Sequence, residues 1–326
     1  MKAQVFARLL CAVFALSVSA TAWAQDYPNR NITLVVPYAA GGGLDVFARV
    51  IAPRLADRLG KSIIIENRPG GGTVIGARAV ARADGDGYTL MLGTSTPLAI
   101  NVTLHKDLGY DPARDFAPIG LIANAPFVLV VDPKLPVKNV GDLVKLAAST
   151  KELLSYGSAG PGSPQHLSME LLKSMTGMKL VHVPYKGDLA AITDLLAGHI
   201  PMQFAEATPA LPLIAAGKVR PIGFSSAKRN PNAPDIPTLA ENGAPEFDLV
   251  SWQMIVAPAK TPRAIINRLH AELKAVIELP EVKADYAKTG RISVDYLSVD
   301  DLRKFMTTEI ARLGKVVEQA GIARSE

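Results

Sequence analysis

Cysteine is almost absent from this chain of 326 residues, and the single one, Cys11, lies close to the N-terminus. Beyond that point the chain has no disulfide, no thiolate metal site and no cysteine nucleophile. Because Arg8-Leu9-Leu10 precedes Cys11 without the small residue that a lipoprotein cleavage site needs, we expect no lipid attachment. A chain of this length can bury a core without disulfides and commonly divides into two domains.

Aromatic residues and basic runs are also scarce. Phe, Trp and Tyr make up 6% of the chain, and basic residues form only short groups such as Lys228-Arg229. A nucleic-acid-binding protein shows clustered basic residues with aromatic residues between them, so we expect no nucleic-acid partner. The net charge of +5 is a mild excess that favours small anionic ligands.

Motifs for catalysis and metal binding are missing as well. The zinc-protease pattern H-E-x-x-H does not occur. The G-x-S-x-G pattern fails, since Tyr156 stands two positions before Ser158 and Pro161 two positions before Ser163. No metal-ligand spacing is found among the five histidines, which are His105, His166, His182, His199 and His270. The sequence therefore predicts no enzyme, no cofactor and no metal site.

The N-terminus indicates secretion. Lys2 and Arg8 supply positive charge, an apolar run covers 9–20, and Ala22-Trp23-Ala24 forms an A-x-A cleavage site. A basic start, a short apolar core and a small-residue exit are the three parts of a secretory signal. The run is shorter than the roughly 20 apolar residues that span a bilayer. We therefore predict a signal peptide over 1–24 and a periplasmic protein.

The rest of the chain alternates β-branched runs with amphipathic helical patterns. This alternation predicts an α/β fold with largely parallel sheets. Helices are expected over 44–59, ending at Gly60, over 77–83, and through most of 262–322, where Ser298 and Asp301 form a capping pair. The expected strands are 32–36, 62–66, 89–92, 118–123, 127–131, 180–183, 202–204 and 219–224.

Two places look like crossings between domains. Residues 123–126 separate two expected strands without a helix, and 246–256 do so on the return. The sequence therefore predicts one lobe from 25–124 and 248–326 and a second lobe from 125–247. Two lobes joined by two crossings make a hinge and a cleft, which is a favoured place for a ligand.

A first glycine-rich loop follows an expected strand and opens a helix. Glycines let the backbone approach a ligand closely, and the free N–H groups of a helix start favour an anion. Asp45 could accept a hydrogen bond from a ligand or simply cap the loop. The candidate ligand residues here are Tyr38, Ala39, Ala40, Gly41, Gly42, Gly43 and Asp45.

A second glycine-rich loop has the same context. Ser163 is placed to cap a helix that has Pro164 at its first position. Both loops could be mere tight turns, but one loop in each lobe favours a two-sided carboxylate clamp. Phosphate is the rival anion, and neither loop has the lysine of a P-loop or the spacing of a dinucleotide fingerprint. The candidates here are Ser158, Gly160, Gly162, Ser163 and His166.

Further polar residues follow expected strands, where α/β sheets bind ligands. His166 could be a base, although a histidine that packs the first helical turn is the favoured interpretation. Lys186 could simply be solvated. The remaining candidate ligand residues are Thr94, Ser95, Thr96, Asn101, Tyr185, Lys186, Gly187 and Glu206.

Several motifs occur together in one order. They are Val35-Val36-Pro37-Tyr38-Ala39-Ala40-Gly41-Gly42-Gly43, Glu66-Asn67-Arg68-Pro69-Gly70, Asp86-Gly87-Tyr88-Thr89-Leu90, Tyr110-Asp111-Pro112, Gly157-Ser158 to His166-Leu167, and Val181-His182-Val183-Pro184-Tyr185-Lys186-Gly187. In this set the chain resembles the Bug family, the extracytoplasmic solute receptors of tripartite tricarboxylate transporters. The resemblance covers essentially the whole chain after the signal.

The resemblance implies a two-lobed type II periplasmic-binding fold that closes on its ligand. It implies di- or tricarboxylates, acidic amino acids or aromatic acids as ligands, held by the two loops largely through backbone groups, with Tyr185-Lys186-Gly187 lining the cleft. Two positions depart from the family. Leu44 replaces a small hydroxyl residue, and Ala205-Glu206 stand where an aspartate and an asparagine are common.

Together these features predict a monomeric solute-binding protein that delivers a small carboxylate to membrane transporter subunits. A sensor protein in the membrane is an alternative partner for the same fold. A secreted lyase or hydrolase with His166 or Asp45 as base is the alternative from another class. It would need a paired acid or nucleophile, and the sequence offers no motif for one.

Overall fold

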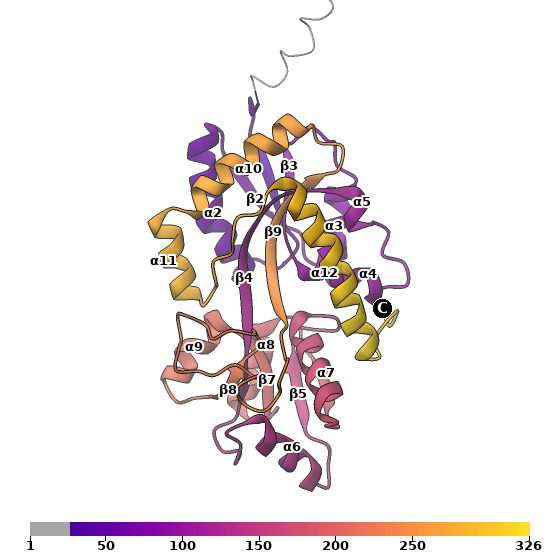
Figure 1. Cartoon of the computed structure of the whole chain (residues 1–326), viewed down its shortest axis with the longest axis vertical. Coiled ribbons are helices and arrows are strands. Elements are labelled where there is room, and N and C mark those ends of the chain that lie inside the picture. Colours follow the sequence, from indigo (N-terminus) through magenta and orange to yellow (C-terminus); the bar gives the residue numbers. More distant parts are fainter. Residues whose placement is uncertain (1–26) are drawn as a thin grey trace, which may run out of the picture.

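The computed structural model describes residues 27–326, so the predicted signal peptide lies outside the described residues. Within this range no helix has the length and apolarity needed to cross a membrane. Two lobes lie one above the other, joined by the long strands β4 (Phe116–Val131) and β9 (Val250–Pro258) (Figure 1). The strands follow one another in the order β2 (Ile63–Asn67), β1 (Ile32–Val36), β3 (Thr89–Thr94), β9, β4, β7 (Met202–Glu206), β5 (Ser155–Ser158) and β6 (Val181–Pro184), and β8 (Arg220–Phe224) pairs with β4.

The first lobe contains both ends of the described chain. Its parallel strands β2, β1 and β3 are extended by β9 and the first part of β4, which run antiparallel. The strands of this lobe are β1 (Ile32–Val36), β2 (Ile63–Asn67), β3 (Thr89–Thr94), β4 (Phe116–Val131) and β9 (Val250–Pro258). Its N-terminal helices are α2 (Gly43–Leu59), α3 (Val74–Ala81), the π-helical turn η1 (Thr96–Ile100), α4 (Asn101–Leu104) and α5 (Pro112–Asp115).

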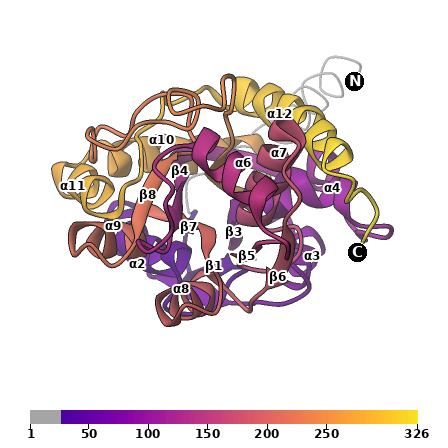
Figure 2. The ribbon, with the colours of Figure 1, turned by 90° about the horizontal axis from the view of Figure 1, so that it is seen from below.

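The second lobe is built on the last part of β4. The other strands are β5 (Ser155–Ser158), β6 (Val181–Pro184), β7 (Met202–Glu206) and β8 (Arg220–Phe224), and the helices are α6 (Val140–Ser149), α7 (Pro164–Thr176), α8 (Asp188–Ala197) and α9 (Ala207–Ala215). Alternate residues of β7 enter two cores, because side chains of a strand alternate between faces. Phe204 packs on the α7 side and Ala205 on the α8 and α9 side. Figure 2 shows α7 next to α12 (Val299–Gln319) and α8 away from both.

The strands β4 and β9 form the crossing between the lobes. Residues 116–126 of β4 pair with β9, and residues 127–131 pair with β7 and β8. The prediction of two strands separated at 123–126 was wrong, because the backbone stays paired through this segment. The prediction of largely parallel sheets was also wrong, since half of the strand pairings are antiparallel. Antiparallel strands need no crossover helix between them, so β4 and β9 can each run directly from one lobe to the other.

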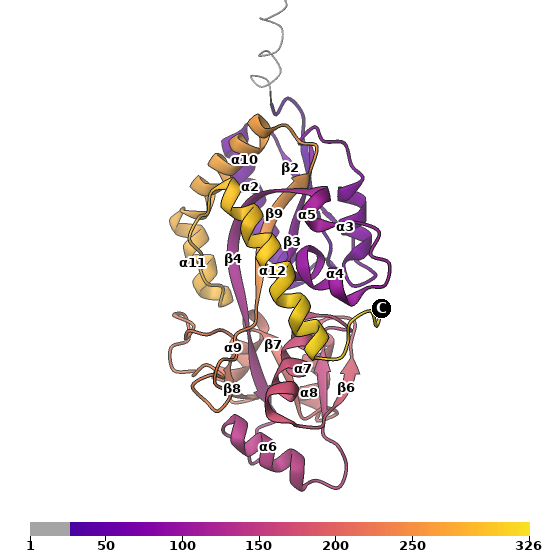
Figure 3. The same cartoon turned by 45° about the vertical axis from the view of Figure 1, so that its right-hand side comes forward.

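Three helices end the chain: α10 (Arg263–Ile277), α11 (Pro280–Thr289) and α12 (Val299–Gln319). The predicted cap of α12 is confirmed, since Ser298 Oγ accepts the Asp301 N–H at 3.2 Å. Helix α12 packs on β4 and α4 of the first lobe and on α7 of the second (Figure 3). It therefore fastens the two lobes together along one side.

Helix α2 shows how the pattern produces the fold. Phe47, Ile51, Leu55 and Leu59 lie on one face, and all four are buried. Burying such side chains contributes roughly 1.5–3 kcal/mol each. The predicted end at Gly60 is confirmed, because this residue takes φ 72° and its N–H bonds to Ala56 O. The helix is thus anchored over its length, and its first turn is held in a defined position.

We predict that Glu309→Ala lowers the free energy of unfolding by about 1–3 kcal/mol. Glu309 on α12 accepts the Trp252 Nε1–H of β9 at 2.8 Å, so the variant leaves a buried donor without a partner. Urea unfolding followed by far-UV circular dichroism measures the change. Glu318→Ala, at an exposed position of the same helix, serves as the control and should cost less than about 0.5 kcal/mol. Equal losses in both variants would contradict this role.

Candidate ligand-binding site

The first glycine loop connects β1 to α2 at the boundary between the lobes. Gly41 has φ +80°, a left-handed conformation that favours glycine. Gly42 caps α2 without any side-chain capping bond, so the first N–H groups of the helix stay available. A Cβ at Gly43 would overlap the Glu206 carboxylate of the second lobe. A side chain at position 43 would therefore require the Glu206 side chain to move.

Asp45 holds this loop in place. Its carboxylate accepts the Gly41 N–H at 2.8 Å and two bonds from Arg49, at 3.0 and 3.1 Å. Burial by itself would raise the pKa of Asp45, but the bonds from Arg49 and Gly41 outweigh burial and hold the pKa below its usual value. Asp45 therefore stays ionised, and its carboxylate oxygens are already bonded within the protein. This favours the role of capping the loop over the role of accepting a hydrogen bond from a ligand. Its oxygens face the loop and the helix.

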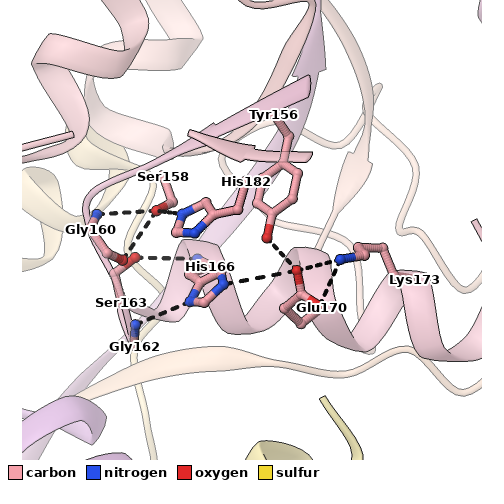
Figure 4. Close-up of polar contacts among 9 residues, drawn as sticks. All are labelled: Tyr156, Ser158, Gly160, Gly162, Ser163, His166, Glu170, Lys173 and His182. Carbon is pink, nitrogen blue, oxygen red and sulfur yellow. Dashed lines mark hydrogen bonds and ion pairs between the residues drawn. The ribbon is translucent and has the colours of Figure 1, made fainter. Parts of the chain in front are cut away.

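The second glycine loop connects β5 to α7. The predicted cap is confirmed, since Ser163 Oγ accepts the His166 N–H at 3.2 Å and Pro164 opens the helix. Ser158 Oγ accepts the Gly160 N–H and donates to Gly160 O, both at 3.1 Å (Figure 4). Ser158 Oγ also lies 2.6 Å from His182 Nε2, so this hydroxyl joins the loop to β6.

His166 fixes the second glycine loop by a hydrogen bond to the loop backbone. Gly162 N–H donates to His166 Nδ1 at 3.1 Å, so this nitrogen carries no proton and Nε2 carries it. The ring stacks on His182 with centroids 3.8 Å apart and planes 9° apart. Burial, and then the neighbouring His182, lower the pKa of His166 to about 4. His166 is thus a neutral positioning residue, because its unprotonated nitrogen is used on the Gly162 N–H.

A buried carboxylate lies beneath the histidines. Glu170 bonds Tyr156 Oη and accepts two bonds from Lys173 Nζ at 2.7 and 2.8 Å (Figure 4). Its Oε1 lies 3.9 Å from His166 Nε2. Sequence reasoning missed Tyr156, Glu170 and His182 as parts of this cluster. The i,i+4 spacing of His166 and Glu170 could have suggested one pair, whereas His182 requires the pairing of β5 with β6.

The polar residues after β3 are buried at the lobe boundary. Thr94 Oγ1 and Tyr38 Oη lie 2.7 Å apart, which joins this strand to the first loop. Ser95 Oγ bonds Ser251 Oγ of β9 at 3.4 Å. Asn101 Nδ2 bonds Gly72 O at 2.9 Å, so this amide faces the turn before α3. Tyr38 and Thr94 are thus in contact, whereas the Ser95 side chain contacts β9 and Asn101 contacts the turn before α3.

The predicted residues after β6 behave differently from one another. Tyr185 Oη donates to Asp194 Oδ2 of α8 at 2.7 Å, so its hydroxyl is used within the second lobe. Lys186 is exposed. Gly187 caps α8 with φ 121°, which brings the next residue, Asp188, to the start of the helix.

Asp188 and Glu206 form an acidic pair that sequence reasoning did not find as a pair. Asp188 Oδ2 accepts the Glu206 N–H at 3.1 Å, and its Oδ1 accepts Gln165 Nε2 at 3.4 Å. Burial, and then the Glu206 charge, raise the pKa of Asp188 to about 8. Across the boundary, Arg291 donates to Gly43 O at 2.6 Å and to Gln253 Oε1 at 3.1 Å. The pair and the guanidinium arrive from segments far apart in sequence.

The lobes are closely apposed at these loops. A Cβ on Gly162 would overlap Leu104 of the first lobe, as one on Gly43 would overlap Glu206 of the second. A surface hollow of about 520 Å³ lies elsewhere, between α2 and β2, where Pro53, Ser62 and Ile65 help to line it. That hollow holds neither glycine loop, so the loops and not the hollow define the candidate site.

The family model "Tripartite tricarboxylate transporter family receptor" matches residues 47–322. The chain belongs to this family. The predicted membership, which includes the Bug proteins, is thereby confirmed, and so is the prediction that the chain is a solute-binding receptor and not an enzyme. Protein BugT of Bordetella pertussis is 34% identical to this receptor over 305 residues, which cover 93% of each chain.

Solved structures agree with the receptor's fold. "R. palustris Rpa4515 with adipate" is 38% identical, covers 91% of this chain and 99% of its own, and superposes with a TM-score of 0.85. MatC from Rhodopseudomonas palustris "with bound malate" is 31% identical, covers 89% of this chain and 100% of its own, and gives a TM-score of 0.82. The predicted two-lobed α/β binding-protein fold is therefore confirmed.

We predict that replacing His166 flattens the loss of stability in acid. A folded pKa of about 4 against the usual 6.5 means that unfolding takes up a proton between these pH values. The stability is therefore fully present above pH 6.5 and is lost as the pH falls toward 4, by up to about 3 kcal/mol for this group. Urea unfolding of the receptor and of His166→Gln between pH 7 and pH 4 measures the difference.

Met175→Gln is the control, because it places the same amide at a 40% exposed position of α7 and changes no titratable group. Its pH profile should parallel that of the unchanged receptor. A parallel profile for His166→Gln would show that His166 is not held neutral by the fold.

Proposed function

We propose that this receptor works in the periplasm, where it binds a small carboxylate between its lobes and delivers it to the membrane subunits of a tripartite tricarboxylate transporter. The observation that carries the proposal is the pair of glycine loops, one from each lobe, that each open a helix at the lobe boundary. The start of α2 favours an anion through its uncapped N–H groups, and the start of α7, which Ser163 caps, favours one through its helix dipole.

The chemistry of the loops supports a carboxylate held by backbone groups. The N–H groups of α2 are free of side-chain caps, and the side chains nearby fix the loops instead of filling them. The similar structures whose titles name adipate and malate are consistent with such a ligand. Ligands in the class therefore include di- and tricarboxylates, acidic amino acids and aromatic acids.

The proposed mechanism is closure about the crossing strands. We assign 25–124 and 248–326 to one lobe and 125–247 to the other, so that β4 and β9 bend where they pass between lobes. Closing contacts exist away from the loops, since Thr208 Oγ1 donates to Thr289 O at 2.9 Å and Asn230 Nδ2 to Gly290 O at 2.8 Å. A ligand that binds the closed form more tightly shifts the population toward that form, and the membrane subunits of the transporter would bind the closed form.

We expect at least one class of carboxylate to raise the melting temperature of the mature receptor, from Gln25 onward. A ligand at 100 times its dissociation constant adds about 2.7 kcal/mol of stability. A thermal-shift screen with mono-, di-, tri- and aromatic carboxylates measures this, with inorganic phosphate and neutral analogues as controls. Receptor shown to be free of retained ligand and insensitive to every carboxylate would contradict the proposal.

We expect Gly42→Trp to abolish binding while the fold is kept. Gly42 has φ −72°, which any residue can adopt, and a Cβ there meets only Ala39 O at 3.3 Å, so the indole would fill the space over the first loop. Calorimetric titration with the best carboxylate from the screen measures the affinity. The control is Ala148→Trp on the exposed face of α6, at the far end of the second lobe (Figure 1). Unchanged affinity in Gly42→Trp would remove the first loop from the site.

A further inference from the structure

Glu206 presents a carboxylate to the first glycine loop from the opposite lobe. It ends β7, and its Oε2 occupies the space that a Cβ on Gly43 would need. Within residues 27–326, its backbone N–H bonds Asp188, whereas no hydrogen bond or ion pair reaches its carboxylate oxygens. The side chain is half-buried at the boundary where the ligand is proposed to bind. A carboxylate in this position needs a partner when closure removes water.

The cation that acts on Glu206 is Arg291 of the first lobe, whose Nη1 has no hydrogen-bond partner within the described chain. Arg291 is 4% exposed, and it uses Nη2 on Gly43 O and Nε on Gln253. Its guanidinium also lies over the Phe47 ring, 4.5 Å from the centroid. Arg291 therefore attracts Glu206 through space without bonding to it, and it cannot neutralise Glu206 and Asp188 together.

Other groups that face Glu206 add no positive charge. Asp188 lies on its backbone side and is held by Gln165. Tyr38, whose hydroxyl contacts Thr94, lies close enough that the Glu206 charge contributes to raising the pKa of Tyr38. Thr96, at 4% exposure, keeps its Oγ1 without a partner within the described chain. Tyr38 and Thr96 belong to the first lobe, so the second lobe meets the first loop with the carboxyl groups of Glu206 and Asp188.

Charge balance separates two kinds of carboxylate ligand. A dicarboxylate would place its second negative charge beside Glu206 and Asp188, where like charges in a partly desolvated cleft repel. A ligand with a cationic nitrogen would supply the missing partner, and charge-assisted hydrogen bonds of this kind are short and strong. The glycine loops can hold one carboxylate of either ligand. The two ligands differ at their other end, and the charge of Glu206 determines which of these ends is favoured.

We propose that Glu206 is the specificity-determining residue of the cleft, and that the receptor prefers a ligand with a carboxylate at one end and a positively charged nitrogen at the other. This inference rests on the proposed carboxylate receptor function and narrows its ligand class. Asp188 acts as a positioning residue, since it fixes the backbone of Glu206 at the end of β7.

The acidic pair of Asp188 and Glu206 predicts a second measurable effect, which is a change in the number of bound protons when a ligand binds. Burial raises the pKa of Glu206 although Arg291 opposes this, and burial together with the Glu206 charge raises the pKa of Asp188. Each carboxyl therefore gives up its proton less readily than a solvent-exposed one. A cationic nitrogen stabilises both carboxylates in their ionised forms, so its binding releases a proton, whereas binding of a second carboxylate group takes one up.

Isothermal titration calorimetry with two matched ligand series tests the inference. One series is the unbranched ω-amino carboxylates with three to six carbons, and the other is the unbranched dicarboxylates of the same lengths. We expect the best amino carboxylate to bind at least about 10-fold more tightly than the best dicarboxylate, a difference of about 1.4 kcal/mol. Titrations in buffers of different ionisation enthalpy should show proton release with the amino carboxylate.

Glu206→Gln removes the charge and keeps the shape, and it should weaken the amino carboxylate at least about 10-fold and leave dicarboxylates as tight or tighter. The matched control is Glu152→Gln, an exposed glutamate of the α6–β5 connection, which should leave both affinities unchanged. Melting curves show whether each variant is folded. The wild-type ligand ratio and proton count test the inference even if Glu206→Gln fails to fold.

A receptor that binds a dicarboxylate as tightly as any amino carboxylate would overturn the inference and leave the proposed function standing. An unchanged ligand ratio in folded Glu206→Gln would overturn it as well. If neither series binds, and the carboxylate screen also gives no shift, the inference and the proposed function both fail.

Discussion

The pairing of β4 with β9 is the constraint on which the rest of this receptor depends. These strands run side by side for 116–126 and 250–258, then part into the second lobe. Because both pass directly between lobes, they bring the carboxyl ends of two separate sheets to one boundary. Every feature of the proposed site lies there: the two glycine loops, the Tyr38–Thr94 contact and the acidic pair. Helix α12 fastens the same boundary from one side, through Trp252 and Glu309.

The close approach of the two lobes explains which residue types lie at their boundary. Gly43 and Gly162 each face a side chain of the opposite lobe with no room for a Cβ. The loops that contain them have little side chain of their own, so other residues fix their shape. Asp45 does this for the first loop as an ion, and His166 does it for the second as a neutral acceptor. In the first loop this leaves the uncapped N–H groups at the start of α2 to meet a ligand carboxylate, whereas the N–H groups of Gly160, Gly162 and His166 in the second loop are already bonded within the loop.

Local sequence rules predicted the elements that local contacts decide. The start of α7 at Ser163 and Pro164, the end of α2 at Gly60 and the cap of α12 at Ser298 all depend on neighbours within a few residues, and all three are confirmed. The predictions at 123–126 and of sheet direction were wrong. Continuous pairing there is set by β9, which lies more than a hundred residues away in sequence, and no local pattern encodes such a partner.

The sequence by itself determined the receptor family, the α/β character and the two glycine loops. These follow from motif order, from the period of apolar residues and from the conformational freedom of glycine, which are properties of short segments. Only the tertiary structure decided what the polar residues do. It turned Asp45 and His166 toward their own loops, stacked His182 on His166, and set Glu206 beside Asp188 and opposite Gly43. The reason is physical: a pKa, a charge balance and a steric limit depend on which distant atoms share a low-dielectric space, and only the packed chain brings them together.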